Sequence, residues 1–210
     1  MKRLFARPGD RIEVDVGAFV ADIQRGDLLI EVQTRSFAAM GRKLDELLGR
    51  YRILLVHPIA VTTFLHKPGA RPRRSPKRGD LFSLFDELVS VPTLLDHPQL
   101  TIEALMVTVD VHQEADPLLR RRRGGWRTVD RALRSVEARH RFDSMDDVAA
   151  LLPDSLPDPF TTADLARHLG TPRDRAQRLA YCLRESGRID PVERTAAGVQ
   201  YRRSHRVTPT

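Results

Sequence analysis

The chain has 210 residues, of which 41% are hydrophobic and 30% are charged, and its formal net charge is +7. This length and composition exclude a disordered protein and leave room for one or two folded domains. The basic surplus favours polyanionic partners, with nucleic acid first and anionic membrane surfaces second.

Cysteine use and hydropathy bear on the compartment. Cys182 is the single cysteine, which excludes an internal disulfide or a Cys-based zinc cluster and favours a reducing cytoplasm. The first ten residues lack the apolar run of a signal peptide. The most apolar segment, 53–65, is interrupted by His57 and Pro58 and is too short to span a bilayer. We therefore expect a cytoplasmic protein without membrane insertion.

The first third of the chain has the pattern of an α/β unit. Residues 10–35 alternate between apolar and polar, which predicts a β-hairpin turning at Arg25-Gly26, and the pattern allows an earlier strand before Gly17. Ser36 is placed to cap a helix that Gly49 ends. The apolar run 52–61 predicts a strand covered on both faces.

Two basic segments separate the elements that follow. Residues 67–80 are rich in Pro, Gly, Lys and Arg and predict a mobile loop. A helix is expected at 80–90 and a strand at 100–113. The second basic loop, 120–127, is expected to open a helix at 128–139, with Trp126 anchoring that helix in the core.

The last third has a different character. A short helix at 145–152 and a Pro-rich turn precede a helix that Thr161 caps and Gly170 ends. Thr171 and Pro172 then serve as cap and first residue of a second helix. Its apolar stripe at helical spacing comprises Ala176, Leu179, Ala180 and Leu183. A hairpin follows, with its tip near 197–198.

Residues 144–203 resemble the winged helix-turn-helix superfamily. The matching pieces are FTTADLARHLG, the recognition helix TPRDRAQRLAYCLRESG and the wing RIDPVERTAAGVQYRR. The resemblance implies that the recognition helix enters the DNA major groove while wing residues touch the backbone. The candidate nucleic-acid-binding residues are Arg173, Gln177, Arg178 and Arg184 on the helix and Arg194, Arg202 and Arg203 on the wing. Two other interpretations stay open: a solvated arginine face, or a module that docks a protein.

The N-terminal hairpin places two carboxylates near each other. With the expected turn, Ala21, Ile23 and Ile30 share the core face, and Asp22 and Glu31 are diagonal neighbours on the other face, about 7 Å apart at the backbone. Two carboxylates at that separation can share a divalent cation such as Mg²⁺. The competing interpretation is the solvated face of an ordinary hairpin.

Asp22 followed by Glu31-Val32-Gln33 and a helix resembles the PD-(D/E)XK nuclease superfamily over residues 12–59. The resemblance implies metal binding by Asp22, Glu31 and the Val32 carbonyl. Gln33 stands where the family usually has Lys, and Lys43 on the following helix is the candidate substitute for that cation. The family commonly has a helix ahead of the first strand, where this chain has only MKRLFARPG.

These observations predict a mixed-sheet α/β fold with a restriction-endonuclease-like core at 1–142 and a winged helix at 143–210. The expected function is that of a DNA-binding protein and Mg²⁺- or Mn²⁺-dependent phosphodiesterase with catalytic residues Asp22, Glu31, Gln33 and Lys43. The alternatives are a catalytically inactive DNA-binding regulator and a protein-interaction adaptor. A homodimer is possible, and the chain also resembles uncharacterised bacterial proteins. Basic loop residues expected to clamp the nucleic-acid backbone are Arg73, Arg74, Arg121 and Arg122.

Overall fold

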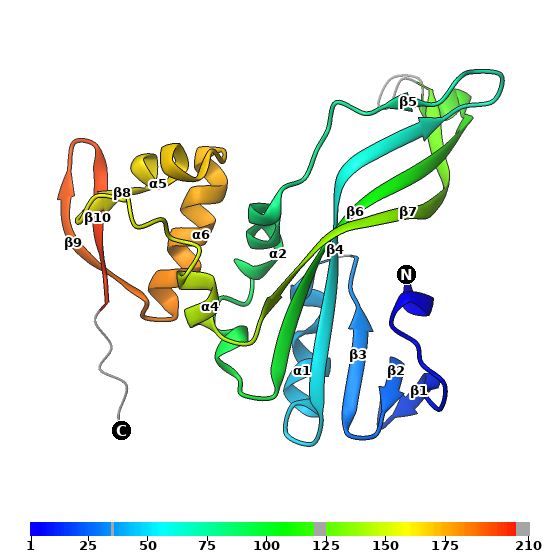
Figure 1. Cartoon of the computed structure of the whole chain (residues 1–210), viewed down its shortest axis with the longest axis horizontal. Coiled ribbons are helices and arrows are strands. Elements are labelled where there is room, and N and C mark those ends of the chain that lie inside the picture. The colour runs from blue at the N-terminus through cyan, green and yellow to red at the C-terminus, as the bar shows by residue number, and fades with distance from the viewer. Residues whose placement is uncertain (35, 120–124, 205–210) are drawn as a thin grey trace.

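A large mixed sheet organises the chain. The computed structural model describes residues 1–34, 36–119 and 125–204. The strand order is β1-β2-β3-β4-β6-β7, with β5 added to β4 (Figure 1). Neighbours β3, β4 and β6 run parallel, and the other pairs run antiparallel. The strands are β1 Arg11–Val16, β2 Phe19–Arg25, β3 Leu28–Val32, β4 Arg52–His66, β5 Arg73–Arg74, β6 Leu100–Ala115 and β7 Trp126–Phe142. The predicted mixed-sheet α/β class is therefore confirmed.

The N-terminal hairpin forms with a different register from the one expected. Arg25 pairs with Leu28 and Ile23 pairs with Ile30, so the turn is Gly26-Asp27 and the predicted centre at Arg25-Gly26 is wrong. Gly26 has a φ of 59°, a left-handed conformation that glycine adopts at little cost and that suits a two-residue hairpin turn.

The strand β2 changes face near Asp22. Ala21 belongs to the core beneath α1, whereas Ile23 packs with Ile30 on the opposite face, so the prediction that both share one face is wrong. Glu13, in the neighbouring strand, has a φ of 52° between the pairs Ile12–Ile23 and Val14–Ala21. The departure from regular alternation in β2 therefore lies opposite an unusual backbone conformation in β1.

The strand β4 is much longer than β3, its parallel neighbour. A 3₁₀ turn at Phe37–Met40 and helix α1, Gly41–Leu47, lead into it, and Ser36 caps the turn by accepting from the Ala38 amide at 3.3 Å. β4 pairs with β3 only as far as Val56, yet it pairs with β6 to His66. β4, β6 and β7 therefore continue together past the ends of β1–β3 (Figure 1).

Part of the basic segment 67–80 is attached to β4 and is not the mobile loop that was predicted. Arg73 and Arg74 form β5, the Ser75 amide donates to Thr63 O at 2.8 Å, and the Gly79 amide donates to Ala60 O at 2.9 Å. A Cβ on Gly79 would lie 2.7 Å from Ile59 Cγ2, so only glycine permits this close approach.

The segment after Gly79 is helical, as predicted. Asp80 forms a capping box with Ser83 at a 3₁₀ turn, Leu81–Leu84, and helix α2, Phe85–Leu88, follows directly. Further 3₁₀ turns lie at Lys2–Leu4, Leu94–Asp96 and Pro117–Leu119.

The helix predicted at 128–139 is wrong, because these residues form most of β7. Leu105 pairs with Arg139 and Val109 with Leu133 in an antiparallel ladder along β6. Ala, Arg and Glu favour helices in isolation, and pairing with a buried strand overrides that preference here.

The C-terminal part is a pair of helices beside a small sheet ordered β8-β10-β9. Its elements are α4 Met145–Ala149, β8 Phe160–Thr161, α5 Thr162–Leu169, α6 Arg173–Glu185, β9 Ile189–Thr195 and β10 Gly198–Arg203. Thr161 caps α5 with Asp164, and Gly170 ends it at a φ of 61°, as predicted. Thr171 does not cap α6: its hydroxyl is buried without a partner among the described residues, and Pro172 takes the cap position.

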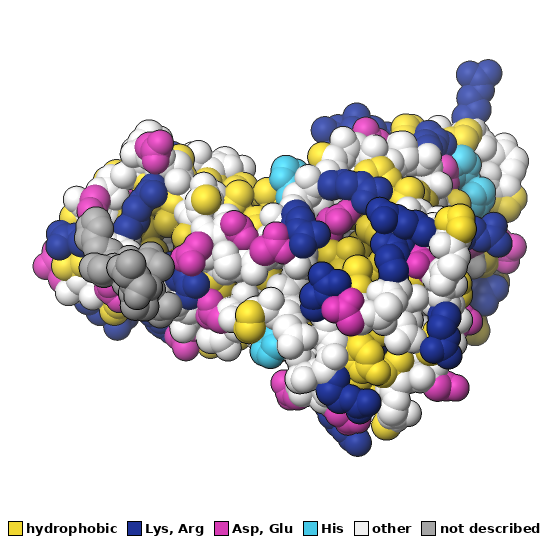
Figure 2. All heavy atoms as spheres, turned by 60° about the horizontal axis from the view of Figure 1, so that its bottom comes forward, with side chains coloured by type: hydrophobic (Ala, Val, Ile, Leu, Met, Phe, Trp, Pro, Cys, Tyr) yellow, Lys and Arg dark blue, Asp and Glu magenta, His cyan; other side chains and the backbone are white. Residues whose placement is uncertain are grey.

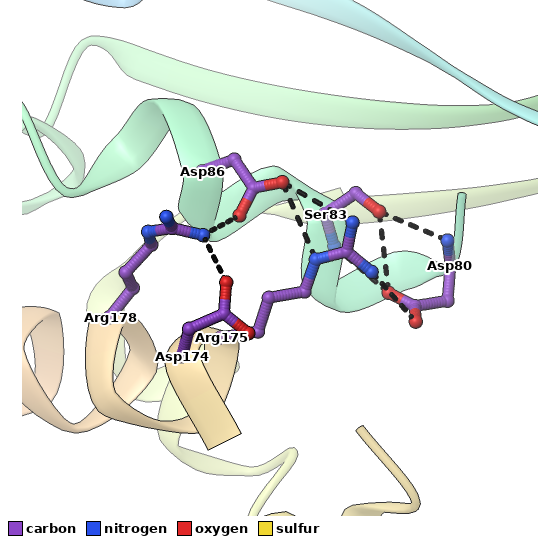
Figure 3. Close-up of polar contacts among 6 residues, drawn as sticks. All are labelled: Asp80, Ser83, Asp86, Asp174, Arg175 and Arg178. Atoms are coloured by element: carbon purple, nitrogen blue, oxygen red, sulfur yellow. Dashed lines mark hydrogen bonds and ion pairs between the residues drawn. The ribbon is translucent and has the colours of Figure 1, made fainter. Parts of the chain in front are cut away.

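The large sheet and the C-terminal part share one hydrophobic core. Leu84, Phe85 and Leu88 belong to the same buried cluster as the α6 stripe Ala176, Leu179, Ala180 and Leu183. Polar contacts add to this packing (Figure 3): Arg175 bonds both Asp80 and Asp86, at 3.1 and 3.3 Å, and Arg178 also reaches Asp86. Helix α6 is therefore held against α2.

The shared core predicts cooperative unfolding. Phe85 is fully buried, so Phe85→Ala should lower the free energy of unfolding by about 3–5 kcal/mol, measured by urea denaturation. Phe82→Ala, at a half-buried neighbour, should cost less. Circular dichroism and the fluorescence of Trp126 should report one coincident transition in the wild type. Two separate transitions would contradict a shared core.

Candidate functional site

Glu31 and Lys43 form an ion pair between the sheet and α1. Glu31 follows Leu29 on the face of β3 that α1 covers, and Lys43 precedes the buried Leu44 on that helix. Lys43 Nζ lies 2.7 Å from Glu31 Oε2 and donates to Val20 O at 2.6 Å. The structure thus brings together two of the four predicted catalytic residues.

The Glu31 carboxyl group is buried and incompletely bonded. Its side chain is 8% exposed, and Oε1 has no hydrogen-bond partner among the described residues. Burial raises the pKa of Glu31 above its ordinary value, and the Asp22 charge adds to this, while Lys43 opposes it. The site therefore holds a carboxylate oxygen that lacks a protein donor.

Asp22 lies beside Val32 and Lys2. The β2–β3 ladder ends at the Ile23–Ile30 pair, and beyond it the Val32 amide donates to Asp22 Oδ2 at 2.8 Å. Lys2 Nζ lies 2.8 Å from Asp22 Oδ1, and this carboxylate raises the pKa of the Lys2 ammonium. Sequence reasoning missed Lys2, since a residue before the first strand carries no pattern that assigns it a partner.

Gln33 is directed away from the carboxylates. Its side-chain amide donates to Ser36 O at 3.0 Å, and its backbone amide donates to Val56 O at 2.9 Å. The Gln33 carbonyl accepts from His57 Nδ1 at 2.9 Å, so one nitrogen of this imidazole has a backbone partner. Burial lowers the pKa of His57, so this imidazole is neutral near pH 7.

A second group of predicted residues lines a hollow between α6 and β10. Arg173, Gln177 and Arg184 share a helical stripe with Tyr181, and with Val199 they border a space of about 300 Å³. Tyr181 was not among the candidates, although its spacing of four residues from Gln177 places it on the same face. Tyr181 is 38% exposed, and its ring lies 5.2 Å from the Arg184 guanidinium.

The remaining C-terminal candidates lie elsewhere. Arg178 faces Asp86 and Asp174 and is therefore turned toward α2 (Figure 3). Arg202 pairs with Asp158 at 3.2 Å, and Arg203 donates to the Leu152 and Pro153 carbonyls. Arg194 is exposed on β9.

The basic-loop candidates are partly placed. Arg73 and Arg74 are exposed on β5, and Arg74 donates to Thr62 Oγ1 at 2.7 Å. Arg121 and Arg122 lie outside the described residues. Trp126 begins β7, with Lys67 Nζ 3.8 Å from its ring centroid, so its predicted role as the anchor of a helix is wrong.

Residues 1–143 match the family described as Domain of unknown function (DUF8091). The chain belongs to this family. A Treponema pallidum (strain Nichols) protein, described as an uncharacterized protein, is 30% identical over 173 residues, which cover 80% of this chain and 69% of the relative. No solved structure matches the chain. In the described ranges, no helix has the length and apolar character needed to cross a bilayer.

The buried Glu31 predicts a pH dependence of stability. A carboxyl group whose pKa rises on folding destabilises the folded state as pH climbs from its ordinary value of 4.5 through the raised value. Glu31→Gln has no carboxyl group to ionise, so its free energy of unfolding should rise relative to that of the wild type as pH increases through this range. Urea denaturation at stepped pH measures the difference.

Asp27→Asn is the control for this experiment. Arg52 lowers the pKa of Asp27 below 3.8, so the stabilising effect of that carboxylate is complete above pH 3.8 and is lost only at lower pH. The difference between Asp27→Asn and the wild type should therefore stay constant above pH 4.5. If the difference in free energy of unfolding between Glu31→Gln and the wild type is also constant with pH, the Glu31 carboxyl group is not desolvated.

Proposed function

We propose that the protein binds nucleic acid and hydrolyses its phosphodiester backbone with a divalent metal at Asp22 and Glu31. The observation that carries this proposal is the 2.7 Å contact of Lys43 with Glu31, next to Asp22. The three side chains Asp22, Glu31 and Lys43 come from β2, β3 and α1, as the resemblance to PD-(D/E)XK nucleases implies. The order β2-β3-α1-β4 is also the strand-strand-helix-strand core of that resemblance.

The donor set fits Mg²⁺ or Mn²⁺. Both ions prefer carboxylate oxygens and fill the rest of their coordination with water and phosphate oxygens. Glu31 Oε1 is a buried carboxylate oxygen without a described partner, and Asp22 supplies a second carboxylate. The described residues contain no group of three or more His, Cys, Asp or Glu for a metal, so water and phosphate would supply the other ligands.

Each residue of the site has a separate task in this proposal. Asp22 and Glu31 hold the ion, which when bound would lower the pKa of a water molecule and offset the charge of the transferring phosphate. Lys43 supplies a fixed positive charge beside Glu31 and supports the phosphate oxygens. Gln33 holds the turn at Ser36, a positioning task in place of the direct catalytic one predicted from the sequence.

The C-terminal part supplies a nucleic-acid contact in this proposal. A helix pair followed by a hairpin is the arrangement that the winged-helix resemblance implies, with α6 as recognition helix. Arg173, Gln177 and Arg184 line the hollow beside β10 and are the residues we assign to nucleic acid. Arg178 is occupied by Asp86 and is left out of that set.

A non-catalytic DNA-binding protein is the second candidate. Lys2 and Lys43 each neutralise one of the two carboxylates, at 2.8 and 2.7 Å. Such pairs are also a stable structural arrangement in their own right. A metal ion would have to compete with Lys2 for Asp22.

Cleavage is tested with supercoiled and single-stranded DNA in the presence of Mg²⁺ or Mn²⁺. Glu31→Gln should abolish metal-dependent nicking, because it removes a ligand charge while keeping the side-chain shape. Asp27→Asn, remote from the site, should cut like the wild type. Metal-dependent activity that persists in Glu31→Gln rules out this site. Binding without cutting by the wild type favours the second candidate.

Binding by α6 is tested with a fluorescent duplex whose affinity is measured against salt. The double variant Arg173→Gln/Arg184→Gln should reduce the slope of log affinity against log salt by about 1.8, since each lost phosphate contact removes about 0.9. The control Arg42→Gln/Arg50→Gln removes the same charge from exposed positions on and after α1 and should leave the slope unchanged. Equal slopes for the wild type and the α6 variant would exclude the hollow as a DNA contact.

A further inference from the structure

A groove runs along the second half of β4, where β3 has ended. It encloses about 440 Å³, within the range of about 300–1,000 Å³ that small-ligand sites usually occupy. Its lining includes four apolar side chains that we call the apolar floor, Pro58, Ile59, Leu65 and Val111, and two residues of α2 border it. The groove therefore offers a surface for a flat, partly apolar group.

Cations without ion-pair partners border this groove. Lys77, Arg78 and Arg131 line it, and none of them forms an ion pair with a residue that the structure describes. Lys77 and Arg78 are held there because Gly79 packs against Ile59 and bonds Ala60. Figure 2 shows Lys and Arg side chains gathered over the large-sheet part of the molecule.

Acidic residues do not cancel these charges. Asp86 and Glu87 also line the groove, but Asp86 is already engaged by Arg175 and Arg178. Among the described lining residues, Glu87 is then the one acidic side chain left to balance the charges of Lys77, Arg78 and Arg131. The groove therefore favours a ligand with a phosphate group.

His57 lies on the wall of the groove with its tautomer fixed. Nδ1 donates to the Gln33 carbonyl at 2.9 Å, so the proton of the neutral ring is on Nδ1 and Nε2 is an acceptor. Nε2 has no hydrogen-bond partner among the described residues, and His57 belongs to the lining of the groove. A ligand N–H can donate to Nε2.

We propose that this groove binds one nucleotide unit, with its phosphate against Lys77, Arg78 and Arg131 and its base over the apolar floor. A base N–H donates to His57 Nε2. Because His57 bonds Gln33, two residues after Glu31, the nucleotide lies next to the carboxylate site. This inference rests on the proposed nucleic-acid function and specifies its ligand. The ligand is a single strand, or a free nucleotide with the same chemistry.

The test uses the full chain in EDTA, so that binding is measured apart from cleavage. A fluorescent oligothymidylate should lose about tenfold in affinity with Lys77→Gln/Arg78→Gln, and its salt slope should fall by about 1.4, at about 0.7 for each single-strand contact. The control Arg42→Gln/Arg50→Gln should match the wild type. Competition by thymidine monophosphate would identify a free nucleotide as the ligand, and failure to compete would identify the strand.

The base contact has its own variant. His57→Asn keeps a donor for the Gln33 carbonyl and removes Nε2, so affinity for oligothymidylate should fall about fivefold while affinity for an abasic strand of equal length stays the same. A purely structural effect would weaken both.

The outcomes separate this inference from the proposed function. If the wild type binds the oligonucleotide and the Lys77→Gln/Arg78→Gln variant binds it equally, the groove is excluded while the proposed function stands. If the wild type binds no nucleic acid, both fail. If binding depends on the groove but no metal-dependent cleavage occurs, the groove stands without catalysis.

Discussion

The unequal lengths of two parallel neighbours, β3 and β4, determine most of what this structure can do. β3 has five residues and ends at Val32, whereas β4 has fifteen and continues to His66. Beyond Val56, β4 no longer has β3 beside it, so its backbone N–H and C=O groups on that side need other hydrogen-bond partners. Val56 directs its backbone groups toward β3, and Pro58, two residues on, directs its nitrogen to the same side. Proline has no N–H to leave unpaired there, which explains its place inside a long strand.

The segment 73–79 takes over this edge. Backbone bonds from Ser75 and Gly79 to β4, together with β5, replace the missing strand at intervals and leave the groove between them. On the β2 side of β3, beyond the Ile23–Ile30 pair, the Val32 amide has no strand partner and donates to the Asp22 carboxylate. The carboxylate site therefore lies where the β2–β3 ladder ends, and the groove lies where β4 loses β3 as its neighbour.

The orientation of α6 depends on a separate constraint, its packing on α2. Arg175 is only 19% exposed and reaches two aspartates, so the helix cannot rotate without leaving charges buried and unpaired. This contact sets which stripe of α6 faces outward. Arg173, Gln177 and Arg184 remain beside β10, and Arg178 does not.

Local patterns in the sequence predicted much of the fold. The alternation at 10–35, the apolar run of β4 and the cap at Thr161 all specify elements through short-range physics, and Lys43 was placed near the sheet by helical spacing alone. Some misses are local, such as the hairpin turn and the cap of α6, and the others concern partners far along the chain. The β7 segment is rich in helix formers, and only pairing with β6 makes it a strand. Lys2 meets Asp22 across twenty residues, and the groove at His57 needs residues from β4, β6, β7 and the segment 73–79 at once. The local periodicity of a sequence does not predict such long-range contacts.

The free edge of the large sheet has a consequence for self-association. β7 is the last strand in the sheet order, and its seventeen residues include five arginines, at positions 127, 131, 134, 139 and 141. An unpaired strand of this length is a template for adding a strand from another molecule. Charged side chains along an edge strand oppose the addition of a second copy, although Arg127, Arg134, Arg139 and Arg141 already have acidic partners within the chain. The charged edge therefore disfavours β7 as the strand through which two copies would join their sheets.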